Sequence, residues 1–228
     1  MSSSLTAAPS DVQGSDARFN TIPSLDGAPP LVTVRHLTKT YRGRPALRDL
    51  SLSLPAGRIV GLMGANGCGK TTLLKILAGV LADYEGQVRI AGHAPGPLSK
   101  ALVSFLPDAD FLATSLTPPR AIAQFSRLFA DFDAAKARRL VEFFALPADR
   151  SIKEMSKGMG EKLRIALMMS RRARVYLLDE PISGVDPAAR EIVLDGVLRD
   201  FESDSLMIIS THLIADVEPI VDSVVFLK

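Results

Sequence analysis

One loop constrains the fold of this chain more than any other feature. Residues 64–72 read GANGCGKTT and fit the phosphate-loop pattern G-x-x-x-x-G-K-[ST]. An apolar run at residues 58–63 precedes the loop, and apolar side chains recur at helical spacing after it. We therefore predict a buried strand, a tight loop and an amphipathic helix. Backbone N–H groups, the helix N-terminus and Lys70 would all face one anion.

Hydrogen bonds from the loop amides and from Lys70 should contribute more to anion binding than the helix dipole does. Charge-assisted hydrogen bonds contribute about 1.5–3 kcal/mol each, whereas a helix dipole contributes about 0.3–1 kcal/mol. Cys68, the only cysteine, cannot form an internal disulfide, and we interpret it as a small side chain at a permissive loop position. The residues expected to contact the ligand are Gly64, Ala65, Asn66, Gly67, Cys68, Gly69, Lys70, Thr71 and Thr72.

Length and charge restrict the class of protein. A chain of 228 residues suits one α/β domain, or such a domain with an inserted subdomain. The 27 Lys and Arg nearly balance the 25 Asp and Glu, so no overall field points to nucleic acid or to an anionic membrane surface. No run of about 18 apolar residues occurs, so any membrane role would need another subunit.

The pattern along the chain predicts a tail followed by one folded domain. Residues 1–30 are rich in Ser, Ala, Pro, Gly and Asp, and we expect a flexible tail without a targeting signal. Residues 31–228 would form the domain, with a helical subdomain at about 110–172. Strands are expected at 31–37, 50–54, 58–63, 87–91, 102–106, 175–178, 206–209 and 224–227, and helices after 72, 117, 133, 160 and 186. Alternating strands and helices imply a mainly parallel sheet covered on both faces.

Two adjacent acids follow the apolar strand at residues 175–178. Asp179 supplies the hard carboxylate that Mg²⁺ prefers, and the Thr71 hydroxyl offers a second oxygen. Glu180 would point to another side and act as general base or water orienter beside a γ-phosphate. An ordinary acidic junction between strand and loop is the alternative interpretation.

Together these motifs resemble the nucleotide-binding ATPase subunit of an ABC (ATP-binding cassette) transporter over residues 31–228. The Walker A motif matches residues 64–71, and Walker B matches 175–179 with the catalytic glutamate at Glu180. Tyr41 matches the aromatic residue that stacks on adenine, residues 183–186 match the D-loop, and His212 matches the switch histidine. The resemblance implies a P-loop NTPase fold: a mainly parallel central sheet, an antiparallel β subdomain on the N-terminal side and an inserted helical subdomain.

Two motifs depart from the family pattern. The signature, usually LSGGQ, reads MSKGM at residues 155–159, where Ser156 and Gly158 remain at a helix start to bind the γ-phosphate held by a partner subunit. Asp108 occupies the position of the Q-loop glutamine; an Asp can accept from water or ligate Mg²⁺. We expect slower basal hydrolysis or a stronger dependence on partners.

The resemblance also implies partners, location and activity. We expect a homo- or heterodimer of ATPase domains that binds ATP and Mg²⁺, and hydrolysis that powers transport, in the direction of export, through separate transmembrane permease subunits. The location would be cytoplasmic, peripheral on the inner face of the cell membrane, with no nucleic acid bound. The alternatives are a soluble ABC ATPase with a regulatory or ribosome-related role, and a nucleotide-gated scaffold with little turnover.

Overall fold

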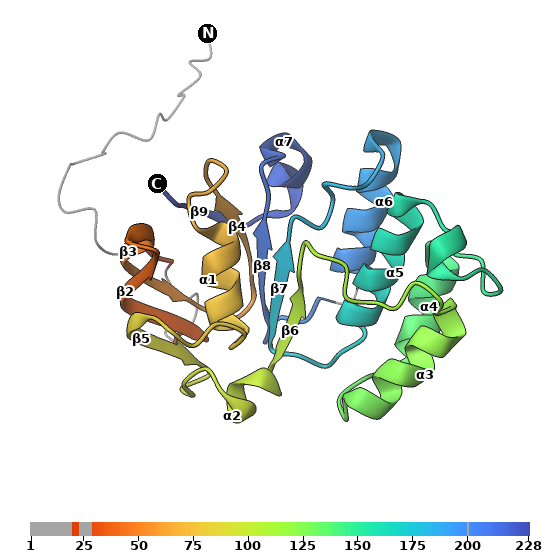
Figure 1. Ribbon diagram of the computed structural model, residues 1–228, viewed down its shortest axis with the longest axis horizontal. Coiled ribbons are helices and arrows are strands. Elements are labelled where there is room, and N and C mark those ends of the chain that lie inside the picture. Colours follow the sequence, from red (N-terminus) through yellow and green to blue (C-terminus); the bar gives the residue numbers. More distant parts are fainter. Residues whose placement is uncertain (1–19, 23–28, 200) are drawn as a thin grey trace, which may run out of the picture.

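Two sheets and the helices around them make up the structure. The computed structural model describes residues 20–22, 29–199 and 201–228 (Figure 1). The parallel sheet has the order β6-β7-β8-β4-β9. Its strands are β4 (Arg58–Met63), β6 (Val103–Leu106), β7 (Val175–Asp179), β8 (Leu206–Ser210) and β9 (Ser223–Phe226). The other sheet has the order β1-β3-β2-β5, with β1 (Asn20–Thr21), β2 (Val32–Tyr41), β3 (Arg44–Leu54) and β5 (Glu85–Ile90).

Helices lie on both sides of the parallel sheet. In Figure 1, α1 lies between the two sheets, and α3 to α6 gather on the far side of the parallel sheet. The α-helices are α1 (Lys70–Leu77), α2 (Pro97–Lys100), α3 (Pro118–Leu128), α4 (Ala134–Phe143), α5 (Lys157–Met169), α6 (Pro187–Leu198) and α7 (Ile214–Val217). Two 3₁₀ turns, η1 (Ile152–Glu154) and η2 (Glu218–Ile220), complete the set. No helix in the described part of the chain is long and apolar enough to cross a membrane.

Alternation along the parallel strands divides the core in two. Val60 and Leu62 of β4 belong to a cluster with α1 and the antiparallel sheet. Ile59 and Met63, their neighbours in sequence, belong to a second cluster with α3 to α6. Successive side chains of a strand point to opposite faces, so a strand that is apolar throughout supports both layers. The predicted α/β fold, with its parallel sheet and antiparallel subdomain, is confirmed.

Several predicted boundaries differ from the observed ones. The strands predicted at 31–37 and 50–54 extend to Tyr41 and begin at Arg44, because Arg42 and Gly43 both adopt positive φ in a tight hairpin. The helix predicted to start at Glu161 begins at Lys157 and ends at Met169, because Ser156 caps its first turn. Asn20–Thr21, inside the predicted tail, pairs with β3; most of that tail lies outside the described residues.

Candidate functional site

The predicted phosphate loop connects β4 to α1 and depends on two crowded glycines. Gly64 has φ 146° and Gly69 has φ 104°. A Cβ on Gly64 would collide with the backbone oxygen of Leu227, and a Cβ on Gly69 with that of Ala46. Only glycine combines this backbone with such close packing. The Gly69 contact also places the β2–β3 hairpin directly against the loop.

Lys70 lies inside this loop. Its side chain is buried, and Nζ donates hydrogen bonds to the backbone oxygens of Gly64 at 2.8 Å and Ala65 at 3.4 Å. The ammonium group is therefore held in the concave side of the loop, where neutral carbonyls are its acceptors. A phosphate would replace these acceptors with charged oxygens, whose hydrogen bonds are shorter and stronger.

Asp179, at the end of β7, is the buried acid of the site. The carboxylate is 1% exposed, and Oδ1 accepts hydrogen bonds from Thr71 Oγ1 at 3.2 Å and Ser210 Oγ at 2.6 Å. Asp179 and Ser210 are partners in the β7–β8 register. Asp179 Oδ2 is buried and makes no hydrogen bond to any described residue. A free carboxylate oxygen beside a hydroxyl is the donor set that Mg²⁺ takes, so these residues fit the ion.

Glu180 diverges from Asp179 and contacts the predicted switch histidine. Its φ is 52°, a left-handed value that costs a non-glycine residue roughly 1–2 kcal/mol. Its N–H donates to the Ser210 backbone oxygen at 3.0 Å, and Oε2 lies 2.8 Å from His212 Nδ1. The strained backbone thus points the two adjacent carboxylates in different directions. Asp179 points inward to the Thr71 hydroxyl, and Glu180 points outward to the His212 imidazole.

Tyr41 ends β2 on the hairpin that packs against the loop. The side chain is 44% exposed, and Lys39 Nζ lies 4.9 Å from the ring centroid. An exposed ring on this hairpin can serve as a stacking platform for a base.

The signature-like residues form a second group. Ser156 caps α5, its Oγ accepting from the N–H of Met159 at 3.2 Å, and Gly158 lies in the first helical turn. The Lys157 side chain packs on Gly184. A Cβ atom added to Gly184 would lie 2.7 Å from Lys157 Cε. Asp108 is exposed and lines a cavity of about 540 Å³ together with Ser156 and Lys157.

The structure therefore brings Asp108 to the signature-like group. Its backbone oxygen accepts a hydrogen bond from Arg164 Nη1 at 3.4 Å. Within the described residues, no hydrogen bond joins Asp108 to Thr71 or Asp179.

Three residues that contact the predicted site residues or lie near them were not predicted from the sequence. Ser210 anchors Asp179, and only the pairing of β7 with β8 reveals it. Glu161 and Arg164 form a buried ion pair one turn apart on α5, and Arg164 also reaches Asp110 at 3.1 Å. Burial raises the pKa of Glu161 to about 7 in spite of Arg164. The i, i+3 spacing of opposite charges was the available signal.

Comparisons with known proteins agree with this geometry. The family described as ABC transporter matches residues 47–183. The chain is 28% identical over 201 residues to the ABC transporter ATP-binding protein YtrB of Bacillus subtilis, covering 87% of this chain and 69% of that protein. It is 31% identical over 205 residues to the Nod factor export ATP-binding protein I of Ralstonia nicotianae, covering 86% and 64%.

Solved structures show the same fold. A structure titled "Structure of ATP binding subunit of ABC transporter" superposes with a TM-score of 0.77 and 26% identity, covering 87% of this chain and 86% of that one. The sequence match includes the phosphate loop and the Asp179–Glu180 pair. The chain belongs to the ABC transporter family, as an ATP-binding subunit whose domain hydrolyses ATP.

Proposed function

We propose that this subunit hydrolyses ATP with Mg²⁺ at the carboxyl edge of the parallel sheet and thereby powers export through separate transmembrane permease subunits. The observation that carries the proposal is the pair of contacts made by adjacent acids. Asp179 meets the Thr71 hydroxyl, and Glu180 meets His212. Phosphoryl transfer to water needs a phosphate cradle, a metal site and a group that positions the water. This edge supplies residues for all three.

Asp179 and Thr71 would hold the metal ion. When bound, Mg²⁺ would neutralise the negative charge that develops on the phosphoryl group. Ser210 keeps the Asp179 carboxylate oriented. The Oδ2 atom of Asp179 therefore stays available to bind a cation, or a water molecule coordinated to that cation. Asp108 lies beside Arg164 and the signature-like residues, and a metal contact there would form only with bound nucleotide or in a closed complex.

Glu180 would accept a proton from the attacking water. His212 Nδ1 lies 2.8 Å from Glu180 Oε2 and would hold the carboxylate in place. With nucleotide bound, the imidazole would turn to the γ-phosphate and leave Glu180 facing the water. Tyr41 would stack on the adenine, and Lys70 together with the 64–72 amides would bind the phosphates.

Ser156 and Gly158 would complete the site of a second copy or of a related subunit. They lie with Asp108 and Lys157 in a separate group on α5. Two subunits arranged head to tail would bring this group to the partner's phosphate loop, which is the homo- or heterodimer that the sequence motifs predict. Lys157, at the start of this helix, would add a positive charge near that phosphate.

Export and a peripheral position on the cytoplasmic side of the membrane are supported by relatives. One is named for Nod factor export, and another, 35% identical over 208 residues but with only 10% of its length covered, is the human phospholipid-transporting ATPase ABCA7. Relatives named as transporter subunits favour this function over a soluble regulatory or ribosome-related role.

The test is the Glu180→Gln variant. We expect ATP binding within about threefold of wild type and hydrolysis reduced at least 10²-fold, because general base catalysis contributes about 10²–10⁴-fold. ATP binding is measured by fluorescence titration, and phosphate release is measured at saturating ATP and Mg²⁺. Glu191→Gln, an exposed acid on α6, is the matched control and should keep wild-type rates. Near-normal turnover of Glu180→Gln would refute the assignment.

ATP should also convert the Glu180→Gln variant to dimers on gel filtration. Adding Ser156→Ala to that variant should weaken dimer formation.

A further inference from the structure

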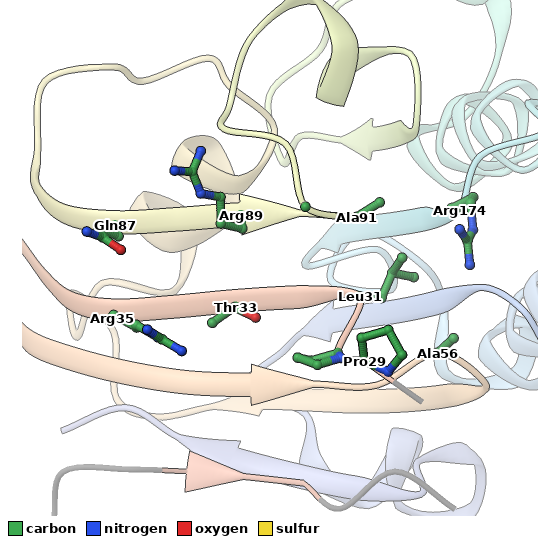
Figure 2. A pocket seen from close by; sticks show the side chains of 11 residues that line it. Pro29, Leu31, Thr33, Arg35, Ala56, Gln87, Arg89, Ala91 and Arg174 are labelled. Carbon is green, nitrogen blue, oxygen red and sulfur yellow. The ribbon is translucent and has the colours of Figure 1, made fainter. Parts of the chain in front are cut away.

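A cavity of about 660 Å³ lies on the solvent side of the antiparallel sheet, away from the nucleotide residues. Figure 2 shows Arg35 and Arg89 on the neighbouring strands β2 and β5, with Arg174 beyond Leu31. Three arginines line it, and none of the described residues that line it is acidic. Its volume is typical of sites for small molecules, which are about 300–1,000 Å³.

The strand register places two of the arginines on one face of the sheet. Arg89 is opposite Thr33, and Arg35 is opposite Gln87, so the two arginines are diagonal neighbours. Diagonal neighbours on a sheet are about 7–8 Å apart, so both arginine side chains start from nearby positions on one face. Neither Arg35 nor Arg89 pairs with a carboxylate of the described residues. Arg174 donates only to a backbone oxygen, that of Asp204, at 3.3 Å.

Topology separates this cavity from the ATP site. Ala56 comes just before β4 and Arg174 just before β7, so the cavity adjoins the amino-terminal ends of the parallel strands. The phosphate loop follows the carboxyl end of β4, and Glu180 follows that of β7. A ligand in the cavity would therefore bind at the opposite edge of the sheet from ATP.

We propose that this cavity binds a small phosphorylated organic molecule. Three guanidinium groups that make no ion pair with a described carboxylate favour an anion with two or more charges, and the planar guanidinium fork matches phosphate oxygens. The remaining lining is largely carbon, including the buried Leu31 and the rings of Pro29 and Pro30. An apolar group attached to the phosphate would cover this surface, as in most small-molecule sites.

The experiment is an amide chemical-shift titration of the full chain with phenyl phosphate, in saturating ADP so that the phosphate loop is filled. We expect shifts centred on the N–H groups of Thr33, Gln87 and Ala91. Inorganic phosphate should cause the same shifts with at least threefold weaker affinity, because it lacks the apolar group. Benzoate, a monoanion of similar shape, should bind at least tenfold more weakly than phenyl phosphate.

Variants make the test specific. Arg35→Gln/Arg89→Gln should weaken phenyl phosphate binding at least tenfold, and Arg174→Gln several-fold. The double variant should keep wild-type ATP hydrolysis, which shows that it is folded. Arg120→Gln/Arg127→Gln removes the same charge from exposed positions of α3 and should bind like wild type.

Three outcomes would overturn the proposal: shifts confined to residues 64–72, equal affinity in the two double variants, or benzoate binding as tight as phenyl phosphate. None of them touches the ATPase assignment, which the Glu180→Gln experiment tests separately.

Discussion

Replacing Ser210 by alanine should destabilise the protein more than the loss of an ordinary buried hydroxyl. The Ser210 side chain is fully buried and donates to Asp179 Oδ1 at 2.6 Å, while the second oxygen of the same carboxylate already lacks a partner. In Ser210→Ala the buried acid would retain only the Thr71 hydroxyl at 3.2 Å. Hydrogen bonds to charged groups contribute about 1.5–3 kcal/mol, so we expect the free energy of unfolding to fall by that amount.

The matched control is Ser104→Ala. Ser104, on β6, is equally buried, but its hydroxyl donates at 2.8 Å to a neutral acceptor, the backbone oxygen of Met168. Neutral hydrogen bonds contribute about 0.5–1.5 kcal/mol. Both substitutions remove one buried oxygen, but only Ser210→Ala removes a hydrogen bond to a carboxylate, together with the longer contact from the Glu180 N–H at 3.2 Å.

The assay is urea unfolding followed by circular dichroism without nucleotide or Mg²⁺, with ATP hydrolysis then measured against Mg²⁺ concentration. We expect Ser210→Ala to lose about 1 kcal/mol more than Ser104→Ala and to need more Mg²⁺ for half-maximal hydrolysis, because Asp179 is less well oriented. Equal losses in the two variants, with an unchanged Mg²⁺ requirement, would refute the view that Ser210 holds the metal-binding carboxylate.

Three further predictions concern the loop and the buried acid of α5. Gly69→Ala should abolish ATP binding measured by fluorescence titration, because its Cβ would collide with the Ala46 carbonyl. Gly67→Ala carries only the strain of a positive φ of 83°, with no atom within 4 Å of its Cβ, and should weaken binding less. Alkylation of the half-buried Cys68 thiol should also block ATP binding, and bound ATP should slow the alkylation. Burial raises the pKa of Glu161 from 4.5 to about 7, so the folded protein keeps a proton that the unfolded chain releases. The free energy of unfolding should therefore fall as pH rises from about 4.5 to 7, by up to about 3 kcal/mol. Urea titrations of Glu161→Gln should lack this component.

The local sequence pattern was sufficient to predict the strands, loop and helix that position the site. The strand, loop and helix around Lys70 were predicted with the phosphate loop in place, because glycine sterics and apolar periodicity act within a few residues. Asp179 was likewise placed correctly at the end of its strand. The Asp133 cap of α4 followed from the same local rules and accepts from the Lys136 N–H at 2.8 Å.

Tertiary structure decided what these elements meet. Thr71 and Asp179 lie 108 positions apart in the chain, and their contact depends on how α1 packs beside β7. Ser210 reaches Asp179 only through the register of two strands. Glu180 adopts a left-handed backbone conformation that directs it away from Asp179. Because this residue is not a glycine, the sequence does not predict a positive φ there.

The three arginines at the opposite edge show the same division most clearly. Arg35, Arg89 and Arg174 belong to no motif and are spread over 140 positions of a nearly neutral chain. Sheet register and the junction of the two sheets bring them to one cavity. Strand identity is a local property, whereas register and the junction between sheets depend on packing between distant segments. The sequence alone thus determined the phosphate loop and its strand-end acids, and the tertiary structure decided their neighbours and the cavity.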